Sequence, residues 1–152
     1  MENFNDKIIV ITGAGSGMGR TLALQLAQRG AMVLLSDINV IGLAETEQLV
    51  QQQHGRCKSY KVDVGDKLQI AAFVKSVLDE FKYIDVLINN AGQLTGGPLL
   101  DQPFLEIQQM LAVNLNATIQ LTQGLLPILI QQKSGKLVMN ASVSAVMYFP
   151  FA

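Results

Sequence analysis

The chain has 152 residues, 49% of them hydrophobic and 15% charged, and its net charge is −1. A chain of this size is expected to fold as one domain, here residues 1–152, and its small charged fraction leaves apolar surface for a partner. The balanced charge excludes the basic patch that a nucleic-acid-binding protein needs, and no apolar run is long enough to cross a bilayer.

The first residues, MENFNDK, are polar and lack the basic start and apolar segment of a secretory signal. Cys57 is the only cysteine, which excludes an internal disulfide and a cysteine-based zinc site and fits a reducing compartment. His54 follows a run of glutamines and is expected to be solvated rather than a metal ligand. We therefore expect a cytoplasmic protein without metal, membrane or nucleic-acid partners.

Apolar strand-like segments alternate with helical ones along the chain. The strand patterns cover residues 7–12, 32–37, 57–64, 84–90 and 135–142, and the helical patterns cover 20–30, 39–55, 67–81 and 103 to about 132. Helices that separate successive apolar strands indicate right-handed βαβ crossovers and a parallel sheet covered on both faces. The sequence therefore predicts an open, doubly wound α/β fold with five strands.

The last of these helices is apolar on more than one side. One stripe consists of Phe104, Ile107, Leu111, Leu121 and Leu125, and a second surface of Met110, Val113, Ala117, Leu126 and Leu129. One of the two should pack on the sheet and the other on something else. Pro127 removes a backbone donor late in the helix and is expected to kink or end it.

The first strand runs into VITGAGSGMG at residues 10–19, which holds four glycines. In a doubly wound sheet the loop after the first strand is the usual phosphate site, because glycines let backbone N–H groups and a helix N-terminus approach a pyrophosphate. The spacing fits T-G-x-x-x-G-x-G, with Thr12, Gly13, Gly17 and Gly19, and does not fit G-x-G-x-x-G or a P-loop. An ordinary tight turn is the alternative for a glycine cluster of this kind.

Asp37 ends the second strand 18 residues after Gly19, close to the spacing expected of the acid that hydrogen-bonds an adenosine ribose. Its alternative role is to cap the helix that starts near Asn39. The carboxylate would repel a 2′-phosphate, and neither Ser16 nor Ile38 brings a compensating cation. Together the loop and Asp37 favour NAD over NADP.

Four motifs in order make the chain resemble the short-chain dehydrogenase/reductase family from Asp6 to the last residue. They are TGAGSGMG at 12–19, DV at 63–64, NNAG at 89–92 and GKLVMNAS at 135–142. The resemblance implies a Rossmann-type sheet with strand order 3-2-1-4-5. It also implies an oxidoreductase that moves hydride between nicotinamide and an alcohol or carbonyl substrate, and a homo-oligomer formed through helix 103–131.

The same resemblance assigns the site residues. Cofactor contacts fall on Thr12, Gly13, Ser16, Gly17, Met18, Gly19, Asp37, Asp63, Val64, Asn90, Ala91 and Gly92. Asp63 should accept from the adenine amino group, and its alternative is to cap the next helix; for residues 90–92 the alternative is a plain turn. Asn114 matches the asparagine that interrupts the long helix and holds a water in the proton relay. Ser142 matches the serine that hydrogen-bonds the substrate carbonyl.

The segment around this serine departs from the usual family pattern. Met139 stands where the family usually has Asn, and Ala141 where it often has Ser. The serine is therefore identified by its spacing of seven residues from Gly135, with Pro150 in support and Ser144 as the competitor.

The family's catalytic tyrosine and lysine follow this serine at a distance that places both beyond Ala152. Tyr148 is too close to Ser142 to replace the tyrosine, and no lysine lies four residues after it. We therefore expect an amino-terminal portion that binds NAD but is catalytically incomplete alone. The alternative is a non-catalytic nucleotide-binding or assembly module with the same fold.

Overall fold

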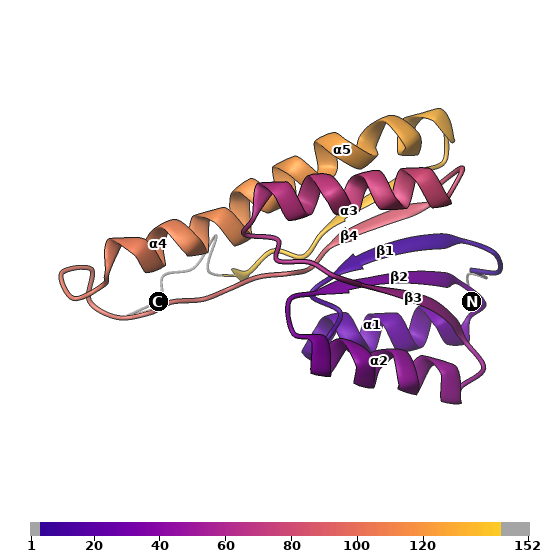
Figure 1. Ribbon diagram of the computed structural model, residues 1–152, viewed down its shortest axis with the longest axis horizontal. Coiled ribbons are helices and arrows are strands. Elements are labelled where there is room, and N and C mark those ends of the chain that lie inside the picture. Colours follow the sequence, from indigo (N-terminus) through magenta and orange to yellow (C-terminus); the bar gives the residue numbers. More distant parts are fainter. Residues whose placement is uncertain (1–3, 144–152) are drawn as a thin grey trace.

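The computed structural model describes residues 4–143, and its centre is one parallel sheet of five strands (Figure 1). The strands are β1 (Ile8–Thr12), β2 (Met32–Asp37), β3 (Arg56–Lys61), β4 (Val86–Asn89) and β5 (Lys136–Met139). Their order is β3-β2-β1-β4-β5, and every neighbouring pair is parallel. This confirms the predicted doubly wound, Rossmann-type sheet, with its switch point between β1 and β4.

Helices cover both faces of the sheet. They are α1 (Gly17–Gln28), α2 (Val40–Gln52), α3 (Lys67–Glu80), α4 (Phe104–Leu111), the π-helix η1 (Ala112–Asn116) and α5 (Ala117–Gln131). The helices α1 and α2 lie on one face, and α3 and α5 lie on the other (Figure 1).

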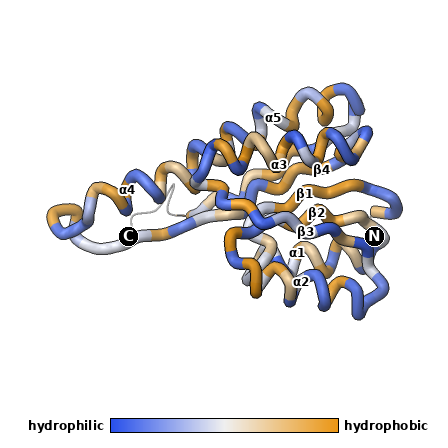
Figure 2. Tube along the Cα trace, viewed as in Figure 1, coloured by the Kyte–Doolittle hydropathy of each residue, from blue (hydrophilic) through white to orange (hydrophobic). Residues whose placement is uncertain are grey.

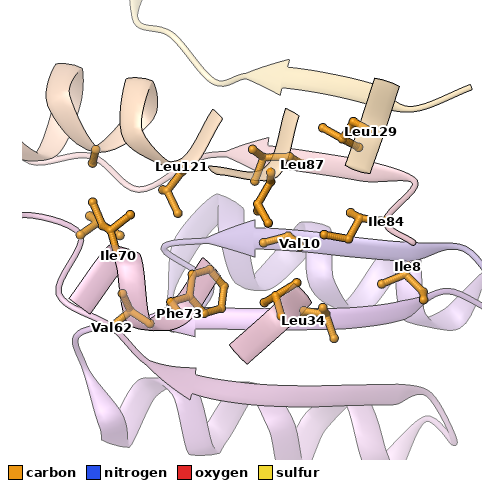
Figure 3. Packing of buried hydrophobic residues seen from close by; sticks show 14 residues of the cluster. Ile8, Val10, Leu34, Val62, Ile70, Phe73, Ile84, Leu87, Leu121 and Leu129 are labelled. Atoms are coloured by element: carbon orange, nitrogen blue, oxygen red, sulfur yellow. The ribbon is translucent and has the colours of Figure 1, made fainter. Parts of the chain in front are cut away.

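Two hydrophobic cores hold the sheet, one on each face. Ile8 and Val10 of β1 enter the core beneath α3 and α5 (Figure 3), whereas Ile9 and Ile11 enter the core beneath α1 and α2. Because both faces of β1 are buried, its first four residues are all apolar and do not alternate with polar ones (Figure 2). This rigid centre fixes the positions of the loops that leave the carboxyl ends of the strands.

Helix α1 begins at Gly17, three residues before the predicted start at residue 20. The sequence pattern missed this first turn because glycine has a low helix propensity. The turn consists of Gly17, Met18 and Gly19, so part of the glycine loop is the open end of a helix.

The predicted long helix consists of three consecutive segments, because η1 lies between α4 and α5. The wider π turn changes the direction in which the following side chains point. Apolar residues spaced at the regular helical period before and after it therefore do not lie on one face. The predicted stripe is therefore wrong: Phe104 and Leu111 are exposed, and the row that packs on the sheet is Ala117, Leu121, Leu125 and Leu129. Pro127 was expected to kink or end the helix; it does not end it, since α5 continues to Gln131, and the kink stays a prediction.

The two edge strands of the described sheet differ in character. β3 has the sequence RCKSYK, whose charged residues disfavour pairing with another strand. All four residues of β5 are exposed, including Leu137, Val138 and Met139. Within residues 4–143, no helix has both the length and the hydropathy that crossing a bilayer requires.

Candidate functional site

A cleft of about 350 Å³ lies at the carboxyl ends of β1 to β4, where the loops that follow these strands meet. It is lined by eleven of the twelve residues predicted to contact a cofactor: Gly13, Ser16, Gly17, Met18, Gly19, Asp37, Asp63, Val64, Asn90, Ala91 and Gly92. The apolar side chains of Ile38, Val62 and Val113 complete the lining. The cleft lies at the switch point of the sheet, the usual ligand position in doubly wound folds.

Thr12, the twelfth predicted residue, lies beneath the cleft and is only 1% exposed. Its hydroxyl oxygen accepts hydrogen bonds from the backbone N–H groups of Asn90 and Ala91, both at 3.0 Å. The Asn90 side-chain amide in turn donates to the carbonyl oxygens of Thr12 at 2.9 Å and Gly13 at 3.3 Å. These bonds tie the glycine loop to the loop after β4 and so form the floor of the cleft.

The glycines of the loop are required for different reasons. A Cβ atom at Gly13, Gly15 or Gly19 would clash within the protein, with the Ala91 Cα atom, the Asp37 carboxyl group and the Gly13 carbonyl oxygen respectively. At Gly17, by contrast, a Cβ would meet no described atom within 4 Å, although its φ of +51° favours glycine. Gly17 is therefore the glycine of this loop that faces open space in the cleft.

The start of α1 lacks a side-chain cap among the described residues. Asn39 and Asp66 accept hydrogen bonds from first-turn N–H groups of α2 and α3, whereas Ser16, at the same position before α1, accepts none. The first turn of α1 also contains no acidic side chain. Its N–H groups are thus open to an acceptor in the cleft, and the helix dipole favours an anion there.

The Asp37 carboxylate is held at the edge of the cleft by two backbone groups. One oxygen accepts from the Gly15 N–H and the other from the Asn39 N–H, each at 2.8 Å. The cap of α2 is Asn39, so the alternative role of Asp37 as that cap is wrong. The carboxylate instead connects the glycine loop to the end of β2.

Asp63 and Val64 bring the end of the β3 segment to the cleft. One Asp63 carboxylate oxygen accepts from the Gly65 N–H at 2.8 Å. The cap of α3 is Asp66, which accepts from the Leu68 N–H at 2.8 Å, so the alternative role of Asp63 as a helix cap is wrong. Within the cleft, Asp63 adds a second carboxylate to that of Asp37.

Asn114 lies in η1 and binds the backbone of Gln93 with both ends of its amide. Its oxygen accepts from the Gln93 N–H at 2.8 Å, and its nitrogen donates to the Gln93 carbonyl oxygen at 2.7 Å. This pair fixes the chain directly after Gly92, a residue of the cleft wall. The interruption of the helix at Asn114 therefore has a local consequence, because it anchors the loop after β4.

Ser142 lies just beyond the end of β5 and is exposed. It is outside the set of residues that lines the cleft. Two residues earlier, the Asn140 side-chain amide donates to the Asn90 side-chain oxygen at 2.8 Å and so connects the β5 end to the cleft floor. Ser144, Tyr148 and Pro150 lie outside the described residues.

Sequence reasoning missed the residues that hold these loops together. Arg20 and Thr46 contact carbonyl groups of the glycine loop, and Asn140 contacts Asn90. Asn140 lies inside the GKLVMNAS motif but was assigned no role. Arg20 and Thr46 lie outside the four motifs, and the one available signal for them is that Arg20 directly follows Gly19. The missed apolar wall residues each adjoin a predicted one, as Ile38 adjoins Asp37.

A known protein family matches nearly the whole chain. A family model described as short chain dehydrogenase matches residues 7–152. An uncharacterised oxidoreductase of Staphylococcus epidermidis is 35% identical over 144 residues, which are 95% of this chain and 61% of the relative. The chain thus spans less than two thirds of that relative's length.

Solved structures show the same fold. A metagenomic short-chain oxidoreductase in complex with NADP has a TM-score of 0.91 and 31% identity, over 98% of this chain and 68% of that one. A xylitol dehydrogenase with bound NAD⁺ also has a TM-score of 0.91 and 31% identity, over 99% of this chain and 58% of that one. Because the family model matches nearly every residue and the cleft is built from the expected motifs, the chain belongs to the short chain dehydrogenase family.

Proposed function

We propose that residues 1–152 form one NAD-binding domain of an oxidoreductase that transfers hydride between nicotinamide and an alcohol or carbonyl substrate. Family membership and the dinucleotides named for two similar structures support this class of cofactor. The observation that carries the proposal is a single cleft that joins the uncapped start of α1 to the Asp37 carboxylate.

The residues at the start of α1 fit a pyrophosphate. The loop offers backbone N–H groups at Gly17, Met18 and Gly19, in the first turn of a twelve-residue helix. The open space at Gly17 lets a ligand approach the backbone closely. We assign the pyrophosphate of the cofactor to this turn, with Ser16 beside it.

The opposite side of the cleft fits an adenosine. Asp37 would accept hydrogen bonds from the ribose hydroxyls, while Asp63 would accept from the adenine amino group, with Val64 in apolar contact. No lysine or arginine occurs among the residues that line the cleft. A 2′-phosphate would therefore meet the negative charge of Asp37 without a compensating cation, which favours NAD over NADP.

The floor of the cleft would carry the nicotinamide ribose over Asn90, Ala91 and Gly92. Bound there, the nicotinamide supplies or takes up a hydride. Asn114 is proposed to hold a water of the proton relay, and Ser142 to hydrogen-bond the substrate carbonyl oxygen. Both assignments rest on the family motifs, and Asn114 has the additional support of its contact with Gln93 next to the cleft.

Isothermal titration with NAD and NADP tests the cofactor assignment. The protein should bind NAD more tightly, and Asp37→Asn should reduce that preference by about tenfold, because the variant loses both a charged acceptor and the repulsion of a 2′-phosphate. Asp79→Asn is a matched control on the exposed side of α3, where Asp79 pairs with Lys75. Tighter binding of NADP than of NAD by the wild type, or binding of neither, would contradict the assignment.

A second measurement concerns turnover by the chain itself. We propose that the 152 residues bind NAD without oxidising an alcohol, because no tyrosine–lysine pair stands at the family spacing after Ser142. The absorbance of NADH is therefore expected to stay constant when verified material is incubated with NAD and simple secondary alcohols. A rise in NADH that depends on the protein would overturn this part of the proposal.

We also propose self-association through the helical region 103–131. Large apolar side chains are exposed along it: Phe104, Leu105, Leu111, Leu115, Ile119, Leu126 and Ile130. Light scattering after gel filtration should report a mass above that of the monomer, and Leu115→Glu with Ile119→Glu should restore the monomer by placing charge in the apolar contact. A wild-type mass equal to that of the monomer would contradict this proposal.

A further inference from the structure

Arg20 contacts the glycine loop and α2 at the same time. Its guanidinium Nη2 lies 2.5 Å from the Gly15 carbonyl oxygen and 3.1 Å from the Gly42 carbonyl oxygen. Its Nε donates to the Thr46 hydroxyl at 2.9 Å. The side chain therefore joins three segments, because it starts from α1 and reaches both the loop before α1 and the first half of α2.

Thr46 extends this contact to the preceding peptide of the loop, which carries the Gly15 N–H. Its side chain is fully buried, and its hydroxyl lies 2.9 Å from the carbonyl oxygens of Ala14 and Gly42 and can donate to either. The approach is close, since a Cβ on Gly42 would lie 2.5 Å from the Gly15 carbonyl oxygen. The carbonyl groups of Ala14 and Gly15 are thus held against α2.

Both of the peptide groups that meet at Gly15 are consequently held. The Gly15 carbonyl oxygen accepts from Arg20, and the Gly15 N–H, which belongs to the preceding peptide, donates to the Asp37 carboxylate at 2.8 Å. Because one Cα joins the two peptides, a shift of the loop at the Gly15 carbonyl also displaces this N–H. The position of the Asp37 carboxylate, whose other oxygen is held by the Asn39 N–H, therefore depends on the contact that Arg20 makes with Gly15.

We propose that Arg20 is a positioning residue for the adenosine end of the cofactor. It acts through Gly15, whose N–H holds the Asp37 carboxylate where a ribose 2′-hydroxyl meets it. The proposal rests on the proposed function, because it requires that the cleft binds an adenine nucleotide. Arg20 itself is not among the residues that line the cleft.

A purely structural role for Arg20 predicts a different result. If the side chain only held α1 to α2, its loss would weaken the binding of every ligand of the cleft by the same factor. A role through Asp37 predicts a loss confined to ligands that carry the 2′-hydroxyl. The salt bridge from Arg20 to Glu45 does not distinguish these roles, since the Glu45 side chain is 57% exposed and such pairs contribute little.

The experiment compares ADP with 2′-deoxy-ADP by isothermal titration in the wild type, Arg20→Ala and Arg20→Lys. We expect Arg20→Ala to weaken the binding of ADP by about tenfold and that of 2′-deoxy-ADP much less, because the charge-assisted bond to Gly15 no longer fixes the loop that holds the Asp37 carboxylate. Lysine keeps the charge but lacks the planar guanidinium that donates to the loop and to Thr46 at once. Arg20→Lys should therefore lose part of the preference for ADP over 2′-deoxy-ADP. In an Asp37→Ala background, Arg20→Ala should no longer change the ratio of the affinities for ADP and 2′-deoxy-ADP.

Arg56→Ala is the matched control. The Arg56 guanidinium also donates to a glycine carbonyl, that of Gly30 at 2.8 Å, and also pairs with a carboxylate, that of Asp6 at 2.9 Å. It lies at the amino end of β3, whereas the cleft lies at the carboxyl ends of the strands. Its removal should leave the affinities for both nucleotides unchanged.

Each outcome decides the proposal. Equal weakening of both nucleotides by Arg20→Ala, or no weakening, overturns it, as does an equal effect in the Asp37→Ala background. If Arg20→Ala does not fold, the same comparison with Arg20→Lys decides. Wild-type protein that binds neither ADP nor NAD would refute the proposed function as well, whereas binding that is the same in the wild type and both Arg20 variants refutes only this inference.

Discussion

The hydroxyl oxygen of Thr12 accepts a hydrogen bond from the backbone N–H of Ala91, 79 positions away in the sequence, at 3.0 Å. The paired register of β1 and β4 ends with Ile11 opposite Ile88. Beyond that point the strands separate, and a side chain takes over from the backbone ladder. This hydrogen bond holds together the loops after β1 and β4, which form the cleft floor, beyond the point where the two strands pair.

Thr12→Val removes this acceptor while keeping the side-chain volume. The N–H groups of Asn90 and Ala91 then lose their partner, and each unsatisfied group is expected to cost about 1–3 kcal/mol. Urea unfolding should show a lower midpoint for Thr12→Val and a smaller change for Thr12→Ser. Thr21→Val serves as the control, because the exposed Thr21 hydroxyl bonds only within α1; equal losses at both positions would contradict the prediction.

Asn114→Ala is expected to release the backbone after β4. The amide of Gln93 loses its acceptor, so its hydrogen exchange should be roughly threefold to tenfold faster, corresponding to one ordinary hydrogen bond. Asn116→Ala, in the same π-helix, is the control and should leave that exchange rate unchanged. An unaltered rate in Asn114→Ala would show that the contact does not order the loop.

Asp66 should contribute to the acid dependence of stability. The hydrogen bond from the Leu68 N–H, with a further one from the Gln69 side chain, lowers the pKa of Asp66 from its ordinary value of 3.8. The stabilisation is therefore present above the unfolded pKa and is lost as pH falls through the lower folded pKa. Asp66→Asn keeps a capping oxygen but does not titrate, so its urea midpoint should fall less between about pH 5 and about pH 3. Parallel curves for the two proteins would refute this.

Cys57 should react slowly with thiol reagents in the folded protein. Burial, with the negative charge of Glu47, raises the pKa of its thiol from 9.0 to about 11. The thiolate fraction at neutral pH is then roughly a hundredfold smaller than at the ordinary pKa, and the thiolate is the reactive form. Alkylation followed by mass spectrometry should be at least that much faster in urea-unfolded protein, where the same single cysteine is the internal control. Similar rates in the two states would contradict the assignment.

Much of the fold was predictable because its signals are local. Apolar runs predicted β1, β2 and β4, a glycine-rich turn predicted the end of β1, and the alternation of strands with helices predicted a parallel sheet. The strand order and the position of the glycine loop at the switch point agree with the resemblance stated from the motifs. The roles of the individual site residues stay predictions.

The features that were missed depend on geometry that a sequence pattern does not contain. The interruption of the long helix at Asn114 was expected from the family motif, but the change of helical phase that the π turn at residues 112–116 brings was not. The choice of Asp66 rather than Asp63 as a cap follows from where the backbone enters α3. Arg20 and Thr46 act across three segments, so their partners are visible only after folding.

The close packing at Gly13 and Gly19 has an evolutionary consequence. These two glycines are constrained by the backbone of Ala91 and by the loop's own carbonyl group, both of which are parts of the protein. A descendant that had lost all affinity for nucleotides would still need them in order to fold. Retention of these two glycines in a relative therefore reports an inherited backbone arrangement, and a gain or loss of ligand binding should be sought at Gly17 and Asp37 instead.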